Sequence, residues 1–218
     1  MSSEFDHVFI CVSCGGGEAS ALAAFGLVEG TPNVHPGQGT ACRRFFFANS
    51  YLELLWVSNA GEAQSEPIQP THLWERWTHR ASGACPLGLG FRAKMQQDAG
   101  IPFSSWEYRP PYLPVPLCLH VASNSNALTE PMLFYLPLGL RSAKRPAPAH
   151  RADLREVTRV EVVSPHAGSL SPEMTAVTTA GLVQLRLGSE YLVELGFDGE
   201  SQGQESDFRP LLPLVFRW

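Results

Sequence analysis

The sequence has no basic stripe, no long apolar run and no surplus of positive charge, and each absence excludes a class of protein. Lys and Arg number 16 against 21 Asp and Glu, so the formal net charge over 218 residues is -5. Nucleic acid is therefore not an expected partner, because binding it requires clustered cations. No stretch approaches the ~18 apolar residues that span a bilayer, so no membrane partner is expected.

Cysteine is also scarce and unevenly spaced. The five cysteines are Cys11, Cys14, Cys42, Cys85 and Cys118. An odd, scattered set does not resemble the disulfide framework of a secreted domain, and the Cys11/Cys14 pair has no second pair to complete a structural zinc site. The first residues are acidic where a secretory signal would be basic. We expect reduced thiols and a cytoplasmic protein.

What is present predicts a globular chain of one structural unit, since 44% of residues are apolar and 17% charged. Alternating apolar residues predict strands, and an alanine-rich stretch predicts a helix. The elements expected in the first module are a strand at 5–13, a helix at 18–27, a short strand near Val28, and strands at 42–48 and 51–58. This order is βαβββ.

The same order is expected twice more, with weaker helices. The second module, about residues 86–137, has predicted strands at 86–93, 106–109, 117–123 and 131–137, with a short helical piece at 95–100. A degenerate third module, 154–197, has a strand at 154–164, a helix at 169–179, and a hairpin of 182–187 with 191–197. Residues 141–151 are expected as a surface linker, 198–207 as a polar mobile segment, and 211–218 as a closing strand.

Tyr51-Leu52-Glu53-Leu54-Leu55 is echoed by Tyr191-Leu192-Val193-Glu194-Leu195, which indicates duplication. A mixed sheet with one helix cannot cover both of its faces, so the modules must pack together. We predict an α+β fold in which repeated βαβββ modules form curved mixed sheets around a cavity.

Residue alternation also proposes a site. On the first strand, His7 shares a face with Phe5, Phe9 and Cys11, while Val8 and Ile10 face the helix. Glu53 lies between leucines at a strand centre, where an unpaired carboxylate is costly to bury. It must face a cavity, a cation or a hydrogen-bond donor.

Four segments resemble the glyoxalase-like branch of the vicinal oxygen chelate superfamily: Phe5-Asp6-His7-Val8-Phe9-Ile10-Cys11-Val12, His35-Pro36-Gly37-Gln38-Gly39-Thr40, Arg44-Phe45-Phe46-Phe47, and Tyr51-Leu52-Glu53-Leu54-Leu55. Cys42 departs from the pattern, since similar proteins have Asn after the Gly-Thr pair. The resemblance implies βαβββ modules around a cavity that often holds a divalent metal. It places His7 and Glu53 where the first module supplies two ligands, and such donors suit Zn, Fe(II), Mn or Ni.

The second module should complete such a site, but no histidine lies near Arg92 at the end of its first strand. His120, which shares a strand with Cys118, is the best remaining donor, and Glu130 or Glu194 could add a carboxylate. We predict His7, Glu53 and His120 as metal ligands. Glu53 is also a candidate catalytic base, and no organic cofactor is evident.

His35 is the second catalytic candidate, because it lies in a Pro/Gly turn where it either caps the loop or lines the cavity mouth. Structural interpretations remain open for each site residue. His7 could bond a backbone carbonyl, Glu53 could pair with Arg43 or Arg44, and His120 could be a half-buried strand residue. His72 and His79 are expected in solvent, on a helix whose apolar face includes Leu73, Trp74 and Trp77.

Three functions fit these observations. The first is a metal-assisted lyase, isomerase or dioxygenase acting on a small oxygen-bearing substrate. The second is a metal-free protein of drug-resistance type that sequesters an apolar or aromatic small molecule, and the incomplete ligand set favours it. The third is a dimerisation module, since exposed strand edges would allow a homodimer.

Overall fold

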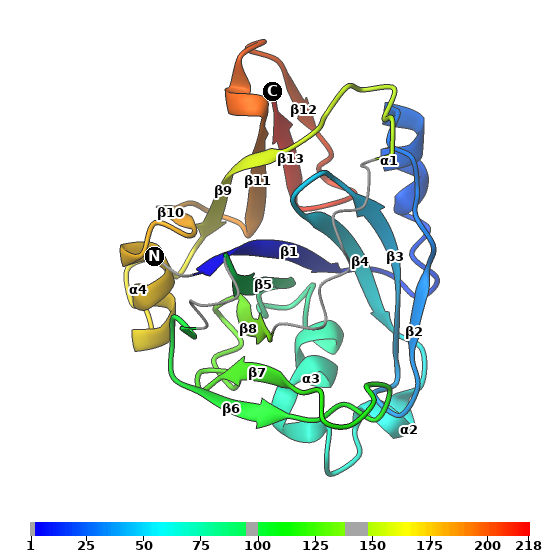
Figure 1. Ribbon diagram of the computed structural model, residues 1–218, viewed down its shortest axis with the longest axis vertical. Coiled ribbons are helices and arrows are strands. Elements are labelled where there is room, and N and C mark those ends of the chain that lie inside the picture. Colours follow the sequence, from blue (N-terminus) through cyan, green and yellow to red (C-terminus); the bar gives the residue numbers. More distant parts are fainter. Residues whose placement is uncertain (1–2, 95–99, 138–147) are drawn as a thin grey trace.

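The computed structural model describes residues 3–94, 100–137 and 148–218, which form two curved sheets with short helices between and beside them (Figure 1). The elements of the first module are β1 (Ser3–Cys11), α1 (Ala19–Phe25), β2 (Asn33–His35), β3 (Thr40–Phe46) and β4 (Tyr51–Val57). A connection follows with α2 (Ala60–Ala63), η1 (Gln69–Thr71) and α3 (Leu73–Thr78). The second module has β5 (Leu87–Ala93), β6 (Ser105–Tyr108), β7 (Leu119–Ala122) and β8 (Met132–Leu136). The last part has β9 (Val157–Ser164), α4 (Pro172–Thr179), β10 (Gln184–Leu187), β11 (Leu192–Phe197), η2 (Asp198–Glu200), β12 (Glu205–Asp207) and β13 (Leu214–Arg217).

The larger sheet joins the first two modules edge to edge in the order β2-β3-β4-β1-β5-β8-β7-β6. β1 and β5 are antiparallel at its centre, and each has a parallel outer neighbour, β4 and β8. Figure 1 shows the sheet bending from β2 and β3 through β1 to β6 and β7. The predicted α+β fold with curved mixed sheets is confirmed.

The bend brings the two edge strands of this sheet close together. The Tyr108 hydroxyl, at the end of β6, donates to Oε1 of Gln38 at 2.8 Å. The ring of Tyr112 lies 4.7 Å from that of His35, at the end of β2. Gly37 permits this approach, since a Cβ there would lie 2.6 Å from Pro111. The side chains of His35, Gln38, Tyr108 and Tyr112 thus close the mouth of the curved sheet, and we call these four side chains the seam.

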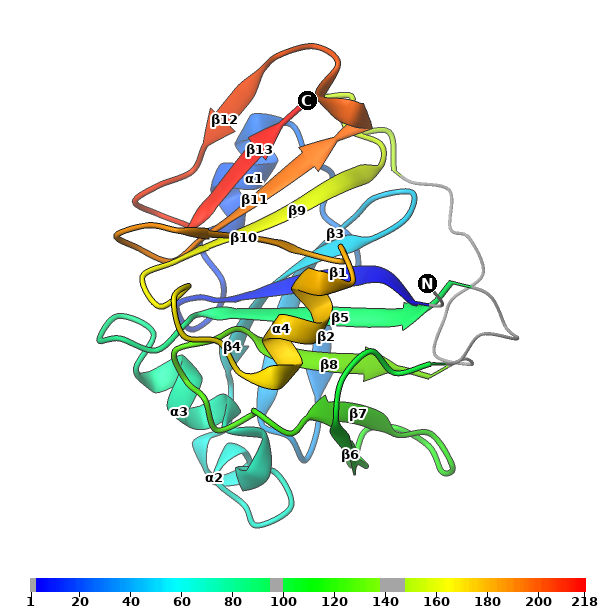
Figure 2. The same cartoon turned by 90° about the vertical axis from the view of Figure 1, so that its left-hand side faces the viewer.

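The smaller sheet, β10-β9-β11-β13-β12, repeats part of the larger one. Along this order, β10 and β9 are parallel, β9 and β11 antiparallel, β11 and β13 parallel, and β13 and β12 antiparallel. The run β4-β1-β5-β8-β7 has the same sequence of directions. The smaller sheet is thus a shortened copy, which lies beside the larger sheet in Figure 2.

This pairing corrects the prediction for the third module. The expected hairpin of 182–187 with 191–197 is wrong, because β9 lies between β10 and β11 and pairs with both. The echo between the segments at Tyr51 and Tyr191 is also not structural, since β4 corresponds to β10 by position. The Gly-Ser-Glu loop can join either two neighbouring strands in a hairpin or two strands with a third strand between them, so the local sequence does not distinguish these arrangements.

Three other expectations differ from the structure. The second strand begins at Asn33 rather than near Val28, since Pro32 has no N–H to donate to a sheet. The polar stretch 198–207 contains η2, and β12 pairs with β13, so it is partly regular. Most of the helical piece expected at 95–100 and most of the linker expected at 141–151 lie outside the described residues.

A single hydrophobic cluster joins both sheets and two of the helices. It contains Val8 and Ile10 of β1, Leu22 of α1 and Met174 of α4. Phe197 of the smaller sheet stacks edge to face on Phe47 of the first module, with ring centroids 4.7 Å apart. A second cluster, which includes Phe9, Cys11 and Phe134, lies on the opposite face of the larger sheet. From Val8 onward, the alternation predicted for β1 therefore agrees with the structure: Val8 and Ile10 lie in the first cluster, and Phe9 and Cys11 lie in the second.

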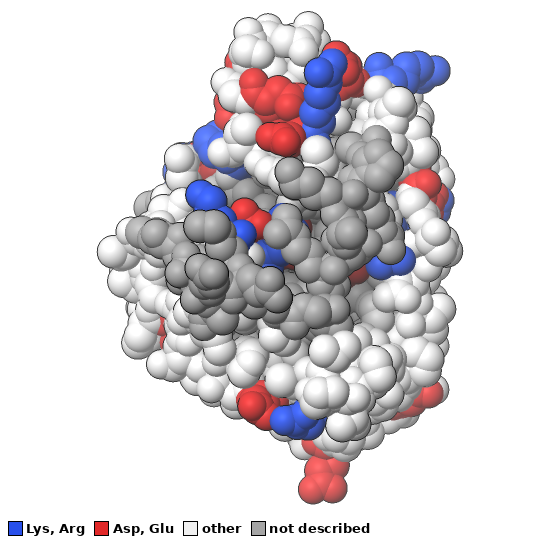
Figure 3. Space-filling view, viewed as in Figure 1, with Lys and Arg blue, Asp and Glu red and all other residues white. Residues whose placement is uncertain are grey.

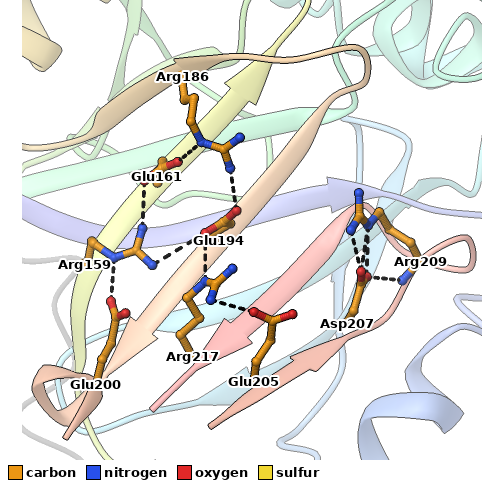
Figure 4. Close-up of polar contacts among 9 residues, drawn as sticks. All are labelled: Arg159, Glu161, Arg186, Glu194, Glu200, Glu205, Asp207, Arg209 and Arg217. Carbon is orange, nitrogen blue, oxygen red and sulfur yellow. Dashed lines mark hydrogen bonds and ion pairs between the residues drawn. The ribbon is translucent and has the colours of Figure 1, made fainter. Parts of the chain in front are cut away.

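The outer face of the smaller sheet carries a network of ion pairs (Figure 4). Glu194 on β11 is 6% exposed and lies among three guanidinium groups, those of Arg159, Arg186 and Arg217. On the face shown in Figure 3, acidic and basic side chains likewise lie close together. Glu194, expected as a possible metal ligand, is committed to this network. Among the described helices, none is long and apolar enough to cross a membrane.

Candidate functional site

A cavity of about 240 Å³ lies on the concave face of the larger sheet. Both modules contribute to its wall. The lining residues are His7, Phe9, Asn33, His35, Gln38, Arg44, Tyr51, Glu53, Leu55, Leu73, Tyr108, Tyr112, Leu113, Leu119, Val121, Met132, Phe134 and Leu136. Nearly all of the polar side chains come from the first module, so the cavity has one polar and one apolar wall.

His7 and Glu53 lie side by side on the polar wall, as predicted from their strands. β1 and β4 are parallel neighbours, and Nε2 of His7 is 3.9 Å from Oε2 of Glu53. The Tyr51 ring stacks on the imidazole at 4.1 Å, and its hydroxyl lies 3.4 Å from Nε2. Burial, with the charge of Glu53 as a second cause, raises the pKa of Tyr51, so its hydroxyl is protonated.

Asp6 lies behind His7, and its Oδ2 is 2.7 Å from Nδ1 of the ring. Neighbouring side chains of a strand normally point to opposite faces, but the register of β1 against β5 shifts between Phe5 and His7. This bulge brings Asp6 to His7 and turns Phe5 toward the core, so the shared face predicted for Phe5 is wrong. Burial opposes ionisation of Asp6, but hydrogen bonds and charges from His7 and Arg92 outweigh it and lower its pKa.

Glu53 is 7% exposed and does not form the ion pair considered as its structural role. In the register of β3 and β4 it is Arg44 that lies opposite Glu53, while Arg43 lies opposite Leu54. Arg44 donates to the carbonyl of Thr31, and Arg43 pairs with Glu29. The contact made by Glu53 on β3 is the thiol of Cys42, whose Sγ is 3.5 Å from Oε1.

His35 lies at the cavity mouth with both ring nitrogens engaged. Nδ1 is 2.8 Å from the Thr40 hydroxyl, and Nε2 is 2.9 Å from Nδ2 of Asn33. Burial lowers the pKa of His35, which keeps the ring neutral. Of the two sequence interpretations, the structure supports both, since the ring holds the turn and lines the cavity.

The apolar wall occupies the positions where the second module would supply ligands. Gly90 of β5 lies opposite His7, and Phe134 of β8 lies next to Gly90. A Cβ at Gly88 would fall within the ring of Phe9, at 2.0 Å from its nearest atom. Glycine and aromatic side chains therefore stand where a symmetric site would have donors.

The structure does not bring His120 to this site. Its neighbours Leu119 and Val121 line the cavity, so His120 points to the other face of β7, where its ring lies 6.4 Å from that of Tyr135. Glu130 is also elsewhere, and it accepts hydrogen bonds from Asn124 and from the N–H and hydroxyl of Ser171. Neither residue is placed to complete a ligand set with His7 and Glu53.

The donors that the structure brings together near Glu53 are different ones. One ligand atom each of His35, Cys42 and Glu53 lies within 4.8 Å of the others. Two ligands of one ion lie roughly 3–3.5 Å apart, so these atoms, and likewise those of His7 and Glu53, would have to move closer together to hold a cation. Nitrogen, sulfur and oxygen donors suit Zn or Fe(II). The donor types fit a divalent cation. To bind it through Nε2, however, His35 would have to release Asn33. Burial and the nearby Glu53 charge also raise the pKa of the Cys42 thiol, which opposes formation of the thiolate that binds metal.

Sequence reasoning missed Asp6 and Cys42 as parts of the site. The signal for Asp6 is an aspartate next to a histidine within an apolar strand. Regular alternation, however, places the side chains of Asp6 and His7 on opposite faces of the sheet. Cys42 was noted only where the sequence departs from the family pattern. Its place opposite Leu55, next to Glu53, depends on the register of two strands.

The comparisons with known proteins agree with this architecture. A family model described as a glyoxalase-like domain matches residues 5–94. This part of the chain, which is less than half of it, is similar to a glyoxalase-like domain. It includes β1 to β5, and hence His7, His35, Cys42 and Glu53. The resemblance seen in the sequence is therefore confirmed for the segment that forms the polar wall. A search of curated proteins finds no match.

One solved structure has a similar fold over the length of the chain. A hypothetical protein from Staphylococcus aureus aligns with 100% of this chain and 99% of its own, with a TM-score of 0.53 and 10% identity. Methylmalonyl-CoA epimerase from Mycobacterium tuberculosis aligns with 62% of this chain and 87% of its own, with a TM-score of 0.37 and 7% identity. At this identity the first likeness concerns fold alone, and the second carries no functional argument.

Proposed function

We propose that the cavity binds a small organic molecule with an apolar, flat body and a polar end, and that Glu53 meets the polar end. The observation that carries this proposal is the division of the cavity into two walls. Ligand sites that bind organic molecules are mostly apolar with a few convergent polar groups. Here Phe134, Leu119 and Val121 offer the apolar surface, and His7 and Glu53 converge opposite them.

Glu53 has the environment of a group that acts on a ligand. Its carboxylate is buried, it has a weak thiol donor on one side, and the imidazole of His7 is beyond normal hydrogen-bond distance. A buried carboxylate without strong donors gains most from a donor or a proton supplied by the ligand. In the enzymatic form of the proposal, Glu53 takes a proton from the bound molecule, and His35 at the mouth orients its outer end.

A divalent cation fits the same wall. His7 and Glu53 would hold it, with Cys42 or His35 as a third ligand, and when bound it would polarise an oxygen of the substrate. The apolar second wall leaves the ligand set on one side of the cavity. This asymmetry supports the alternative of metal-free sequestration, in which the molecule is bound but not transformed. Homodimer formation and a cytoplasmic location remain predictions.

A matched pair of probes tests the proposal. We expect 2,3-dihydroxynaphthalene, which has a flat apolar body and two neighbouring oxygens, to raise the melting temperature and to quench tryptophan fluorescence. Glu53→Gln should weaken its binding by at least about tenfold, whereas Glu66→Gln, at an exposed position, should not. Equal binding by the wild type and Glu53→Gln, or no binding by either, contradicts the proposal.

Metal content separates the two forms of the proposal. Protein purified without a histidine tag is analysed for Zn, Fe, Mn and Ni, and the probe titration is repeated after chelation. Stoichiometric metal that is lost from Glu53→Gln supports the metal-assisted enzyme. Probe binding that is unchanged by chelation supports sequestration.

A further inference from the structure

The contacts behind His7 determine which of its nitrogens faces the ligand. Asp6 is 7% exposed, and each of its carboxylate oxygens has one partner: Oδ2 meets Nδ1 of His7, and Oδ1 accepts from a terminal nitrogen of Arg92. An ionised carboxylate can only accept hydrogen bonds. The hydrogen in the contact between Asp6 and His7 must therefore lie on Nδ1.

Arg92 is itself fixed by three acceptors. Its Nε donates to Glu4 at 2.8 Å, and its second terminal nitrogen donates to the carbonyl of Asn49 at 2.7 Å. The Asn49 side chain in turn bonds both the N–H and the carbonyl of Val157 in the smaller sheet. Arg92 is thus held beside Asp6 by contacts with β1 and with the turn between β3 and β4, and that turn is itself bound to the smaller sheet.

The ring of His7 is held equally firmly on its faces. Tyr51 stacks on one face at 4.1 Å, and the edge of Phe134 lies 5.0 Å away. Gly90 opposite leaves the space the ring occupies, since a Cβ there would come within 2.9 Å of Nδ1. With Nδ1 turned to Asp6, Nε2 is the nitrogen that faces Tyr51, Glu53 and the cavity.

We propose that Asp6, held by Arg92, is a positioning residue that keeps a proton on Nδ1 of His7 and so presents the lone pair of Nε2 to the ligand. Nε2 of His7 and the carboxylate of Glu53 are then two neighbouring acceptors on the polar wall, and the Tyr51 hydroxyl, 3.4 Å from Nε2, is the protein donor that a ligand would join or replace. Their natural partner is a hydrogen-bond donor. This names the ligand class as a flat apolar molecule that carries a hydroxyl or ammonium group, an inference that rests on the proposed function.

Asp6→Asn is the informative variant. Arg92 requires an acceptor, so the carbonyl oxygen of the new side-chain amide must turn to it and the amide NH2 must turn to His7. Nδ1 then has to accept, and the ring proton moves to Nε2, which lies 3.9 Å from Oε2 of Glu53. The proton and the lone pair of the His7 ring thus exchange nitrogens, and the side chain at position 6 keeps its size. Glu4→Gln is the matched control, because it alters another carboxylate on Arg92 without touching His7.

Nitrogen NMR of the histidine rings reads the tautomer directly. Spectra are recorded without ligand at about pH 8, above the ordinary histidine pKa, and the His7 signals are assigned by their loss in His7→Gln. We expect the Nδ1–H form in the wild type and in Glu4→Gln, and the Nε2–H form in Asp6→Asn. A wild-type ring that is cationic or in the Nε2–H form overturns the proposal even if Asp6→Asn does not fold.

Binding supplies the second readout. The wild type should prefer 2-naphthol over 2-methoxynaphthalene, which cannot donate, by about tenfold or more. Asp6→Asn should lose most of this preference, and Glu4→Gln should keep it. No preference in the wild type overturns the ligand class. If neither naphthalene binds, the proposed function fails, whereas the NMR result still tests the role of Asp6.

Discussion

Gly90 on β5 lies directly opposite His7 on β1, and the missing side chain at Gly90 is the space that the imidazole ring fills. The two modules thus meet at an unequal pair, with an imidazole on one strand and a glycine on the other. The position of the His7 ring depends on this glycine as well as on the contacts with Asp6 and Tyr51.

Gly90→Ala should therefore disturb the site from the far wall. The new Cβ would lie 2.9 Å from both the His7 ring and Phe134. Overpacking of this kind costs about 1–3 kcal/mol of unfolding free energy, and the shifted ring should weaken binding of 2,3-dihydroxynaphthalene. Chemical denaturation and probe titration measure the two effects. Gly17→Ala is the control, since nothing lies within 4 Å of a Cβ there; equal behaviour of the two variants would refute the steric argument.

Glu53→Gln should leave stability nearly unchanged while it reduces binding. An ion-paired glutamate would strand a buried cation when neutralised, at a cost of about 3–5 kcal/mol. Here Arg43 pairs with Glu29 and Arg44 donates to Thr31. We expect a change in unfolding free energy below about 1 kcal/mol, measured by urea denaturation. A decrease of several kcal/mol in unfolding free energy would indicate that Glu53 has a structural role.

The cysteines should differ sharply in reactivity. Burial raises the pKa of Cys11 to about 12 and that of Cys85 to about 11, and it raises the pKa of Cys42 further. Cys14 is exposed. Because the thiolate is the nucleophile, iodoacetamide near neutral pH should label Cys14 first, as read by peptide mass spectrometry. Early labelling of Cys42 in folded protein would show that burial and the Glu53 charge do not keep its thiol protonated.

Stability should fall in mild acid because of two buried histidines. Burial lowers the pKa of both His35 and His150 below 6.5 in the folded state. The unfolded chain then binds protons first, so stability decreases as the pH falls through about 6.5 toward the folded pKa. Asp6 has a lowered pKa, and its contribution is lost only below about pH 4. Urea denaturation at a series of pH values should show the first decrease, and His35→Gln should make it smaller.

The chain should unfold as one unit, as the composition and length predict. Phe197 is fully buried and stacks on Phe47 of the other sheet. Phe197→Ala should cost about 3–5 kcal/mol and shift the transitions seen by far-ultraviolet circular dichroism and tryptophan fluorescence together. Two separated transitions, with only one moved by the substitution, would show that the sheets are independent domains.

The sequence predicts best where local pattern and sheet geometry agree. β1 and β4 alternate regularly, so the faces of Val8, Ile10 and Glu53 and the proximity of Glu53 to His7 follow from the residues and the family resemblance. The bulge at Asp6 does not follow, because one extra residue in a strand leaves no mark in its composition. It is the reason that Asp6 was overlooked.

His120 shows the other limit. On a strand, a shift of one position exchanges the two faces, and four residues give too short a pattern to fix the phase. The order of β9, β10 and β11 is likewise set by long-range pairing, which the sequence of the connecting loop does not encode. Prediction is therefore most accurate in the first module, apart from the bulge at Asp6 and the start of β2, and weakens toward the end of the chain.

The seam has a kinetic consequence. β2 and β6 are not hydrogen-bonded neighbours, and the described contacts across this edge include the Tyr108–Gln38 bond and the tilted contact between the rings of Tyr112 and His35. Separating these side chains opens the cavity without breaking a strand ladder. For a molecule bound as proposed, we therefore expect movement of Tyr108 and Tyr112 to limit the rate of release. Substitution of these tyrosines should speed entry and escape by similar factors, as measured by stopped-flow binding, and should change the equilibrium affinity little.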